Sequence, residues 1–439
     1  MAVTVDQAPP ERARMPVRHV AAAVVGNALE FYDFLTYGYF AVYIGRTFFP
    51  TFGKSSLLLS LATFGVGFLT RPIGAIVIGS MGDRIGRKPA MLLSFTLMGV
   101  AIVGLALTPS YGRIGMAAPI LVLLFRLLQG FALGGEVGPT TAYLVEAAPI
   151  HRRGFYSSMQ YASQDTAVLA AGLVGTALAS MLTAQELQDW GWRVAMLIGA
   201  LIVPFGLLVR RGLPETLHAA DDAALAPDAT TGELSWSKKL RPYLSLIILG
   251  LMMLMSGTIA SYVTSYMTTY ALETLHMQAT IAFGVIIVNG VFSVMFEPIS
   301  GWLSDICGRK PVMLIPGFIM LLSILPCFWL ISHFRTVLVF YTTMAWLSAL
   351  IGLNTTPIVT VITESLPKSI RAGTLATVYA FAISIFGGST QFTISWLIDV
   401  TKDPLAPAYY WSTALVIGLI AMALVKESAP LIRKPFDSA

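Results

Sequence analysis

The stretch Gly79-Ser-Met-Gly-Asp83-Arg84-Ile-Gly86-Arg87-Lys88 occurs a second time, 222 positions later, as Gly301-Trp-Leu-Ser-Asp305-Ile-Cys-Gly308-Arg309-Lys310. Gly, Asp, Gly, Arg and Lys recur at identical offsets, and each copy lies between two apolar segments. A second repeat has a spacing of about 218 positions, because Glu146, Pro149, Arg153 and Gly154 return as Glu364, Pro367, Arg371 and Gly373. Matched repeats at this distance indicate that one half of the chain duplicates the other.

The composition is that of a membrane protein. Hydrophobic residues make up 56% and charged residues 12%, against roughly 45–50% and about 25% in soluble domains. The basic pI of 9.1 does not indicate a nucleic-acid partner, because the charges lie in short loops between apolar segments and form no basic stripe. The two cysteines, Cys307 and Cys327, are too few for a disulfide framework or a zinc site, so neither a metal nor a cofactor is predicted.

Twelve apolar segments are long enough to cross a membrane. Each has about twenty or more residues, which as a helix spans a ~30 Å hydrocarbon core. Helix is the required conformation because lipid cannot hydrogen-bond open backbone groups. The predicted spans are 19–44, 55–80, 89–108, 116–146, 154–180, 192–210, 243–271, 279–303, 311–331, 336–364, 373–399 and 408–426.

The repeat divides these spans into two predicted six-helix bundles, 19–210 and 243–426. The hydrophilic segment 211–242 has the composition of a linker and lies near the midpoint. Residues 1–18 and 427–439 are predicted cytoplasmic tails, and the first of these has no apolar stretch of the kind found in signal peptides.

Lysine and arginine are distributed unevenly between the two sides. Of the 28 such residues, 20 fall in segments that are cytoplasmic if the N-terminus is inside, and 6 fall on the opposite side. The remaining two, Arg71 and Arg126, lie inside predicted spans. This excess of positive charge predicts that both termini are cytoplasmic.

The repeated loops predict a gate on the cytoplasmic side. Their glycines allow tight turns, and their acidic and basic residues can pair with one another and with helix ends. We interpret them as a latch that holds the outward-open state; anchoring of the topology by positive charge is the alternative. The predicted gate residues are Asp83, Arg84, Arg87, Glu146, Arg153, Asp305, Arg309, Glu364 and Arg371. Ile306 stands where the first copy has Arg84, so the second latch has one charge fewer.

The repeated loop resembles the signature of the major facilitator superfamily. Three further motifs are similar to its metabolite–proton symporter branch: Asn27-Ala-Leu-Glu30-Phe-Tyr-Asp33-Phe, Arg71-Pro72-Ile-Gly74 and Arg126-Leu-Leu-Gln129-Gly130. The motif Gly154-Phe-Tyr156-Ser-Ser-Met-Gln160-Tyr-Ala-Ser163-Gln164 looks like the citrate and tricarballylate symporters. The resemblance covers essentially the whole chain. It implies an all-α membrane protein of twelve transmembrane helices in two pseudo-symmetric six-helix bundles, acting as a secondary transporter in a bacterial inner membrane.

Ionisable side chains inside spans are candidates for function, because placing charge in a bilayer is costly. Glu30, Asp33 and Tyr37 share one helical face of the first span. Asp33 lies about 20 Å from the cytoplasmic end of its span and Arg126 about 15 Å from the outer end of the fourth, so their depths agree. That these two spans are neighbours is implied by the resemblance.

We therefore predict an ion pair between Asp33 and Arg126, with Glu30 and Glu136 nearby. A carboxylate that gains and loses an arginine partner changes its proton affinity, which is what coupling to a proton gradient needs. A permanent structural ion pair is the alternative. Asp165 and Glu297 are further acids within spans, and the sequence offers no interpretation of Glu297.

A substrate site is predicted near the midplane between spans 1, 4, 5, 7, 10 and 11. Arginine, hydroxyl and amide groups can hydrogen-bond the carboxylates of a small substrate. The neutral groups also commonly join membrane helices to one another, and this is the alternative for each of them. The predicted substrate-binding residues are Arg126, Arg71, Tyr37, Gln160, Gln164, Tyr262, Tyr266, Asn354 and Gln391.

The charge inside the spans bears on the substrate. Arg71 and Arg126 contribute +2, and the four acids Glu30, Asp33, Glu136 and Asp165 contribute −4, a net −2. Such a site favours either an anion that enters together with protons or a substrate with a positive end. The resemblance favours proton symport of citrate or a related tricarboxylate, with a dicarboxylate or a zwitterion such as proline or betaine as the alternative.

Other classes of function fit the sequence less well. A membrane receptor that carries nothing would need a large cytoplasmic output domain, for which the short tails and linker leave no room. The sequence has no Ser/His/Asp set, metal-ligand cluster or P-loop, which argues against an enzyme and against ATP-driven transport. The expected partners are a small organic anion, protons and the lipid bilayer, and nothing in the sequence requires more than a monomer.

Overall fold

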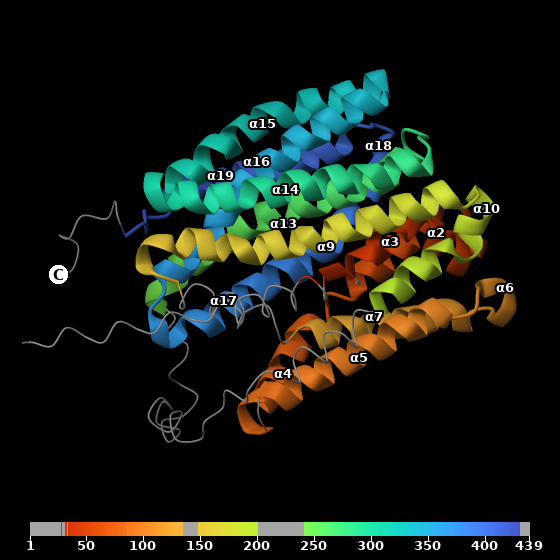
Figure 1. Cartoon of the computed structure of the whole chain (residues 1–439), viewed down its shortest axis with the longest axis horizontal. Coiled ribbons are helices and arrows are strands. Elements are labelled where there is room, and N and C mark those ends of the chain that lie inside the picture. The colour runs from red at the N-terminus through yellow and green to blue at the C-terminus, as the bar shows by residue number, and fades with distance from the viewer. Residues whose placement is uncertain are drawn as a thin grey trace, which may run out of the picture.

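The computed structural model describes residues 28, 31–32, 34–85, 87–134, 148–200 and 241–430, in part without side chains, as at 82–88 and 368–373. Within these ranges the chain is a bundle of long helices without a strand (Figure 1). The larger helices of the first part are α2 (Ala41–Phe48), α3 (Ser56–Val66), α4 (Arg71–Ile85), α5 (Arg87–Leu107), α7 (Ala117–Leu133) and α9 (Arg153–Met181). Short helical turns α6 (Tyr111–Ile114) and α10 (Ala184–Glu186) lie between them.

The second part of the chain is described almost without interruption. Its helices are α13 (Leu244–Glu273), α14 (Ala279–Cys307), α15 (Arg309–Phe334), α16 (Val337–Ser365), α17 (Lys368–Ala382), α18 (Gly388–Thr401) and α19 (Ala406–Leu424). A π-helical turn, Ile383–Gly387, joins α17 to α18. Most of these bounds agree within a few residues with the spans predicted from hydropathy.

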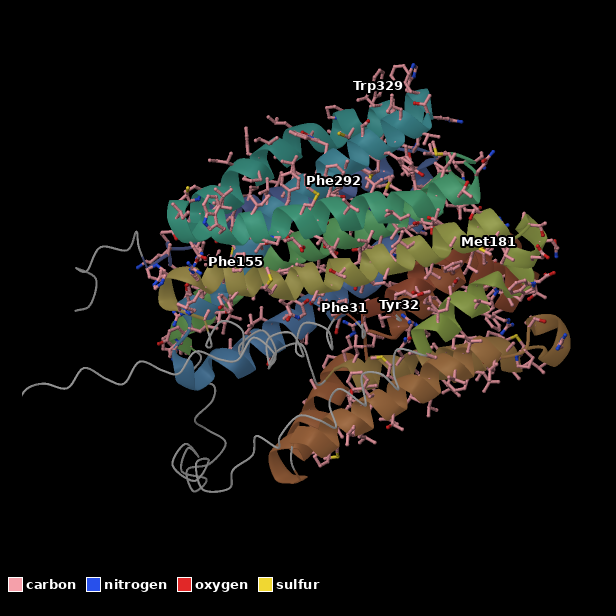
Figure 2. All side chains as sticks on the ribbon, viewed as in Figure 1. Phe31, Tyr32, Phe155, Met181, Phe292 and Trp329 are labelled. Carbon is pink, nitrogen blue, oxygen red and sulfur yellow. The ribbon has the colours of Figure 1, made fainter. Side chains whose placement is uncertain are left out.

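Seven segments of the described chain are long and apolar enough to cross a membrane: Ser56–Ile78, Arg241–Glu273, Ala279–Cys307, Arg309–Phe334, Val337–Ser365, Thr377–Thr401 and Ala406–Leu424. Two shorter apolar helices, Leu92–Leu107 and Ala117–Leu133, also fall within predicted spans. Large apolar side chains point outward from the bundle, including Met181, which is 81% exposed, and Trp329 (Figure 2). Exposed apolar surface on long helices of this kind suits contact with lipid.

The helical course is interrupted just before Pro72. Helix α3 ends at Val66 and α4 begins at Arg71, with a four-residue turn between them. Proline fits the first turn of a helix, because the N–H that it lacks has no partner there. Arg71, the first residue after this turn, is only 4% exposed.

Helices α9 and α14 pack antiparallel and make the most extensive helix–helix contact of the described chain (Figure 1). Glycines allow their backbones to approach closely. A Cβ atom on Gly172 would lie 2.8 Å from the backbone nitrogen of Ile287, and one on Gly290 would lie 2.8 Å from that of Leu169. We call this contact the α9–α14 seam. It joins a helix of the predicted first half to one of the predicted second half.

The two parts of the chain also meet at the end of the bundle that is predicted to face outside. Arg46 after the first span donates a 2.8 Å hydrogen bond to Glu273 at the end of α13. The Phe40 ring lies 4.6 Å from that of Phe283. Nearer the middle of the bundle, the Ser384 hydroxyl donates to the carbonyl of Phe68. The halves are therefore in contact on this side.

Candidate functional site

A cavity of about 110 Å³ lies between helices of both parts of the chain. Its described walls come from residues 31–39 and from α9, α13, α14, α16 and α17, with Ile383 of the π turn. Most lining side chains are apolar, hydroxyl-bearing or amide. The charged residues among the described lining are two acids, Asp165 and Glu297.

A second feature is a pair of buried arginines that both contact one aromatic ring. The guanidinium carbons of Arg71 and Arg126 each lie 4.3 Å from the ring centroid of Phe34. Arg71 also stacks on Phe68 at 4.3 Å, and Arg126 contacts Tyr37 and Phe64 at 4.5 and 5.0 Å. Cation–π attraction of this kind is strongest where water is excluded, as it is here.

The two guanidinium groups retain unused hydrogen-bonding capacity. Arg126 donates to Gln129 Oε1 and, at 3.2 Å, to the carbonyl of Phe64. The buried Nε of Arg126 and the Nε and Nη2 of Arg71 have no hydrogen-bond partner in the described structure. Buried donors without partners are costly. A carboxylate that reached them would complete charge-assisted hydrogen bonds.

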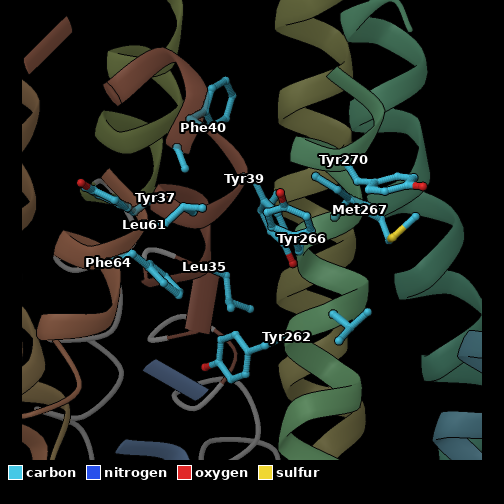
Figure 3. Close-up of a cluster of buried hydrophobic side chains, with 14 of the residues drawn as sticks. Leu35, Tyr37, Tyr39, Phe40, Leu61, Phe64, Tyr262, Tyr266, Met267 and Tyr270 are labelled. Atoms are coloured by element: carbon cyan, nitrogen blue, oxygen red, sulfur yellow. The ribbon is translucent and has the colours of Figure 1, made fainter. Parts of the chain in front are cut away.

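Tyr262 lies between the arginine pair and the cavity. Its ring lies 6.2 Å from Phe64 and 5.6 Å from Phe68, on the arginine side, and it also lines the cavity. Figure 3 shows Tyr262 on the helix opposite Leu35 and Phe64, with Tyr266 further along the same helix. Tyr262 therefore borders both the cavity and the aromatic rings that hold the arginines.

The other predicted substrate residues occupy different surroundings. Gln164 lines the cavity, and Tyr37 lies under Arg126 with its hydroxyl directed at the carbonyl of Ser60, 3.4 Å away. Gln391 is 1% exposed, and neither of its amide atoms has a partner among the described residues. Gln160 and Tyr266 are buried outside the described cavity lining.

Asn354 faces away from the cavity. Its amide donates 2.6 Å to the carbonyl of Met313 on the neighbouring helix α15, whereas Ile351 and Thr355 of the same helix line the cavity. This position matches the alternative raised for the neutral polar residues, a bond between helices. The predicted proton-coupling residues Glu30, Asp33 and Glu136 lie outside the described residues.

The second copy of the repeated loop forms a buried polar network, which we call the Asp305 network. The carboxylate of Asp305 accepts the backbone N–H groups of Gly154 and Phe155 at 2.8 and 2.9 Å, and so caps the first turn of α9 across the seam. Arg309 donates to Asp305 at 2.7 Å and to Glu364 at 3.1 Å. The Arg309 side chain is 0% exposed, and its partners 5% and 4%.

Three of the predicted gate residues are thus brought together, Asp305, Arg309 and Glu364. Arg153 is the first residue of α9, and its buried Nε has no partner among the described residues. The remaining gate residues lie outside the described residues or side chains: Asp83, Arg84, Arg87, Glu146 and Arg371.

Glu427, just after α19, extends the network. Its carboxylate accepts the backbone N–H groups of Arg309 and Lys310 at 3.0 and 2.9 Å, which caps α15 from a distant part of the chain. Ser428 then donates 2.7 Å to Glu364. Burial raises the pKa of Glu427, but the N–H donors from Lys310, Ala429, Arg309 and Ser428 outweigh it and hold the pKa below its ordinary value. The segment predicted as a tail therefore begins with residues bound to the helical body.

We expect Glu427→Gln to lower the free energy of unfolding by about 1 kcal/mol at neutral pH, the usual worth of a capping side chain. The folded-state pKa of Glu427 is depressed, so its contribution is full above the ordinary value of 4.5 and is lost as the pH falls through the folded value. Denaturant unfolding in detergent at several pH values measures the difference. A difference that does not shrink in acid would contradict this assignment.

Two features were not predicted as a site from the sequence. Glu427 stands at the start of a short polar segment that the sequence predicts to be a tail. The sequence shows Glu297 as an acid within a span, but which residues surround it depends on the register of the α9–α14 seam. Hydropathy carries no information on that register.

Comparison with known proteins agrees with this architecture. The family model of the Major Facilitator Superfamily matches residues 24–391. The citrate-proton symporter of Klebsiella pneumoniae is 35% identical over 92% of this chain and 90% of its own. The proline/betaine transporter of Salmonella typhimurium is 31% identical over 93% and 83%. A crystal structure of D-xylose-proton symporter superposes with a TM-score of 0.76 at 18% identity, covering 94% of this chain and 98% of that one.

The long apolar helices, the buried charges and the matching fold define a membrane-embedded protein of the transporter class, whose relatives are not enzymes. The chain belongs to the Major Facilitator Superfamily. Its fold is the all-α fold of that family, as the resemblance of the repeated loops implied.

Proposed function

We propose that this chain is a proton-coupled symporter that imports citrate or a related tricarboxylate by alternating access. The observation that carries the proposal is the arginine pair on Phe34, a buried double positive charge with unused N–H donors. A substrate with several carboxylates is the complement of such a pair. The relatives named citrate-proton symporters, at 35% and 36% identity, support the same substrate.

In this proposal the carboxylates of the substrate meet Arg126 and Arg71, while Gln164, Tyr262 and Gln391 supply neutral hydrogen bonds. Aromatic rings on the arginines exclude water, which strengthens each charged contact. Asp33 is the proposed proton carrier, with Glu30 and Glu136 beside it, and its place next to Phe34 in the sequence supports access to the arginine pair. Protonation offsets the charge of an incoming anion.

The proposed movement is a rocking of two halves, 19–210 and 243–426, about the site. The Asp305 network is the proposed cytoplasmic latch between them, because it joins α9 to α14 and α15 through buried charges. We further propose a bacterial inner-membrane location with both termini in the cytoplasm, on the distribution of Lys and Arg. A monomer is the proposed functional unit.

A zwitterion such as proline or betaine is the second candidate substrate. The observation that favours it is the acidic cavity, in which Asp165 and Glu297 are the charged groups of the described lining. The proline/betaine transporter at 31% identity agrees with this reading. A positively charged substrate end would be attracted to the cavity, whereas a polyanion would not.

Uptake into proteoliposomes with an imposed inward proton gradient separates these candidates. Labelled citrate is offered against unlabelled tricarballylate, 2-oxoglutarate, shikimate, proline and betaine. Gradient-dependent citrate uptake that tricarballylate displaces is the expected result. A parallel assay uses labelled proline or 2-oxoglutarate with the same unlabelled compound as competitor. Specific uptake of either of these, together with no uptake of citrate, would overturn the tricarboxylate substrate. Absence of any gradient-dependent uptake would overturn proton symport.

A further inference from the structure

Two acids from different halves of the chain meet at the α9–α14 seam. Leu169 packs on Gly290 across the seam. One turn earlier in α9, Asp165 is therefore opposite the turn of α14 that carries Ser293 and Glu297. The Asp165 carboxyl group lies within hydrogen-bonding reach of both the Ser293 hydroxyl and the Glu297 carboxyl. Both acids also line the cavity.

The pair is deep in the bundle. Asp165 lies about 18 Å from the start of α9 and Glu297 about 15 Å from the end of α14, at the helical rise per residue. Glu297 is 3% exposed, and its Oε2 atom is buried without a hydrogen-bond donor among the described residues. The next residue is Pro298, which has no N–H to offer.

No cation lies against the pair in the described structure. The other titratable groups of the described cavity lining are four tyrosines, Tyr39 from the first span, Tyr161 from α9, Tyr262 from α13 and Tyr379 from α17. The buried ion pairs of the described chain belong to Arg309, at the start of α15. The two carboxyl groups therefore have no positively charged partner among the described residues.

Two carboxylates in contact cannot both be ionised in surroundings of low polarity, because their repulsion and their desolvation act in the same direction. A single proton shared between them removes one charge and supplies the donor that Glu297 Oε2 lacks. Paired acids that share one proton titrate as a unit. The missing hydrogen-bond donor therefore points to a proton as the ligand of this site.

We propose that Asp165 and Glu297 together form a proton-binding site of the transport cycle, split between the two moving halves. This inference rests on the proposed symport, to which it adds a second protonation site beside that of Asp33. While the seam is closed, the pair holds one proton between an acid and a carboxylate. When the seam opens and water enters, the two groups separate, the proton passes to water, and two hydrated carboxylates remain.

The test uses Asp165→Asn and Glu297→Gln in proteoliposomes. Each amide keeps the shape of the protonated acid, so exchange of labelled for unlabelled substrate without a gradient should continue. Accumulation driven by a gradient of one pH unit should fall by about tenfold, since each coupled proton contributes a factor of about ten per pH unit. The matched controls are Glu186→Gln and Asp189→Asn, the same changes at exposed positions, and they should accumulate substrate like the original chain.

A second measurement is direct. Substrate is added to each purified protein in weakly buffered detergent that contains a pH indicator. The number of protons taken up or released should be smaller for either variant than for the controls. Accumulation and proton exchange equal to the original chain would overturn the inference. Loss of both exchange and accumulation in correctly folded variants would also overturn it, because the pair would then bind substrate. Failure of the original chain to accumulate substrate would instead reject the proposed function, and no variant is needed to see it.

Discussion

Replacing Arg126 by lysine is expected to weaken binding of a tricarboxylate by about 100-fold, while leaving the fold intact. Truncating one partner of a buried, hydrogen-bonded charge contact costs about 2–5 kcal/mol. Lysine keeps the charge but lacks the planar group that stacks on Phe34, Tyr37 and Phe64 at 4.3–5.0 Å. It also lacks the Nε–H that is left for a ligand.

Titration calorimetry with citrate and with proline measures this change. The matched control is Arg193→Lys, which makes the same substitution on an arginine that stacks on Trp192 at 4.4 Å and lies outside the described cavity lining. The control should bind citrate normally. Unaltered citrate affinity in Arg126→Lys, with normal unfolding, would remove Arg126 from the substrate site.

The Asp305→Ala variant is expected to lose about 3–5 kcal/mol of stability, the usual cost of removing one partner of a buried ion pair. The Arg309 guanidinium would remain fully buried, with Glu364 as its one remaining acidic partner in the described structure. The first turn of α9 would at the same time lose the acceptor for the N–H groups of Gly154 and Phe155. The effect therefore combines an uncompensated charge with an uncapped helix.

Thermal or denaturant unfolding in detergent measures the loss. Asp399→Ala is the matched control, because Asp399 pairs with Lys402 on the surface, with side chains 54% and 74% exposed. Exposed pairs contribute about 0–1 kcal/mol, so this variant should unfold nearly as the original chain does. Equal losses in the two variants would show that the Asp305 network does not stabilise the junction of α9 with α14.

The helices were largely predictable, because a bilayer allows few alternatives to an apolar helix. Span 279–303 became α14, Ala279–Cys307, and span 336–364 became α16, Val337–Ser365. The observed helices differ from the predicted spans where the backbone is irregular, as at the turn before Arg71 and at the π turn Ile383–Gly387. Short-range deviations of this kind depend on packing against neighbours, which hydropathy does not report.

The site was predictable in its residues more than in its arrangement. Arg71 and Arg126 stood out as the cations inside spans, and the structure places both on Phe34. The proximity of Asp165 to Glu297 depends on the glycines of the α9–α14 seam, which fix how the two helices align. At the helical rise per residue, these glycines are spread along about 20–30 Å of the seam. Asn354 shows that residue type alone does not establish a ligand-binding role. Its amide, which could bind a ligand, donates instead to the Met313 carbonyl.

The contacts of Glu427 with α15 and of Ser428 with α16 determine where a C-terminal label or tag can be joined to the protein. An affinity handle or fluorescent reporter fused directly after Val425 would delete the carboxylate that holds the backbone of Arg309 and Lys310. It would also delete the hydroxyl that supports Glu364. Fusions that keep residues through Ala429 preserve both contacts, so the position of the join decides whether the reporter reads the native protein or a weakened one.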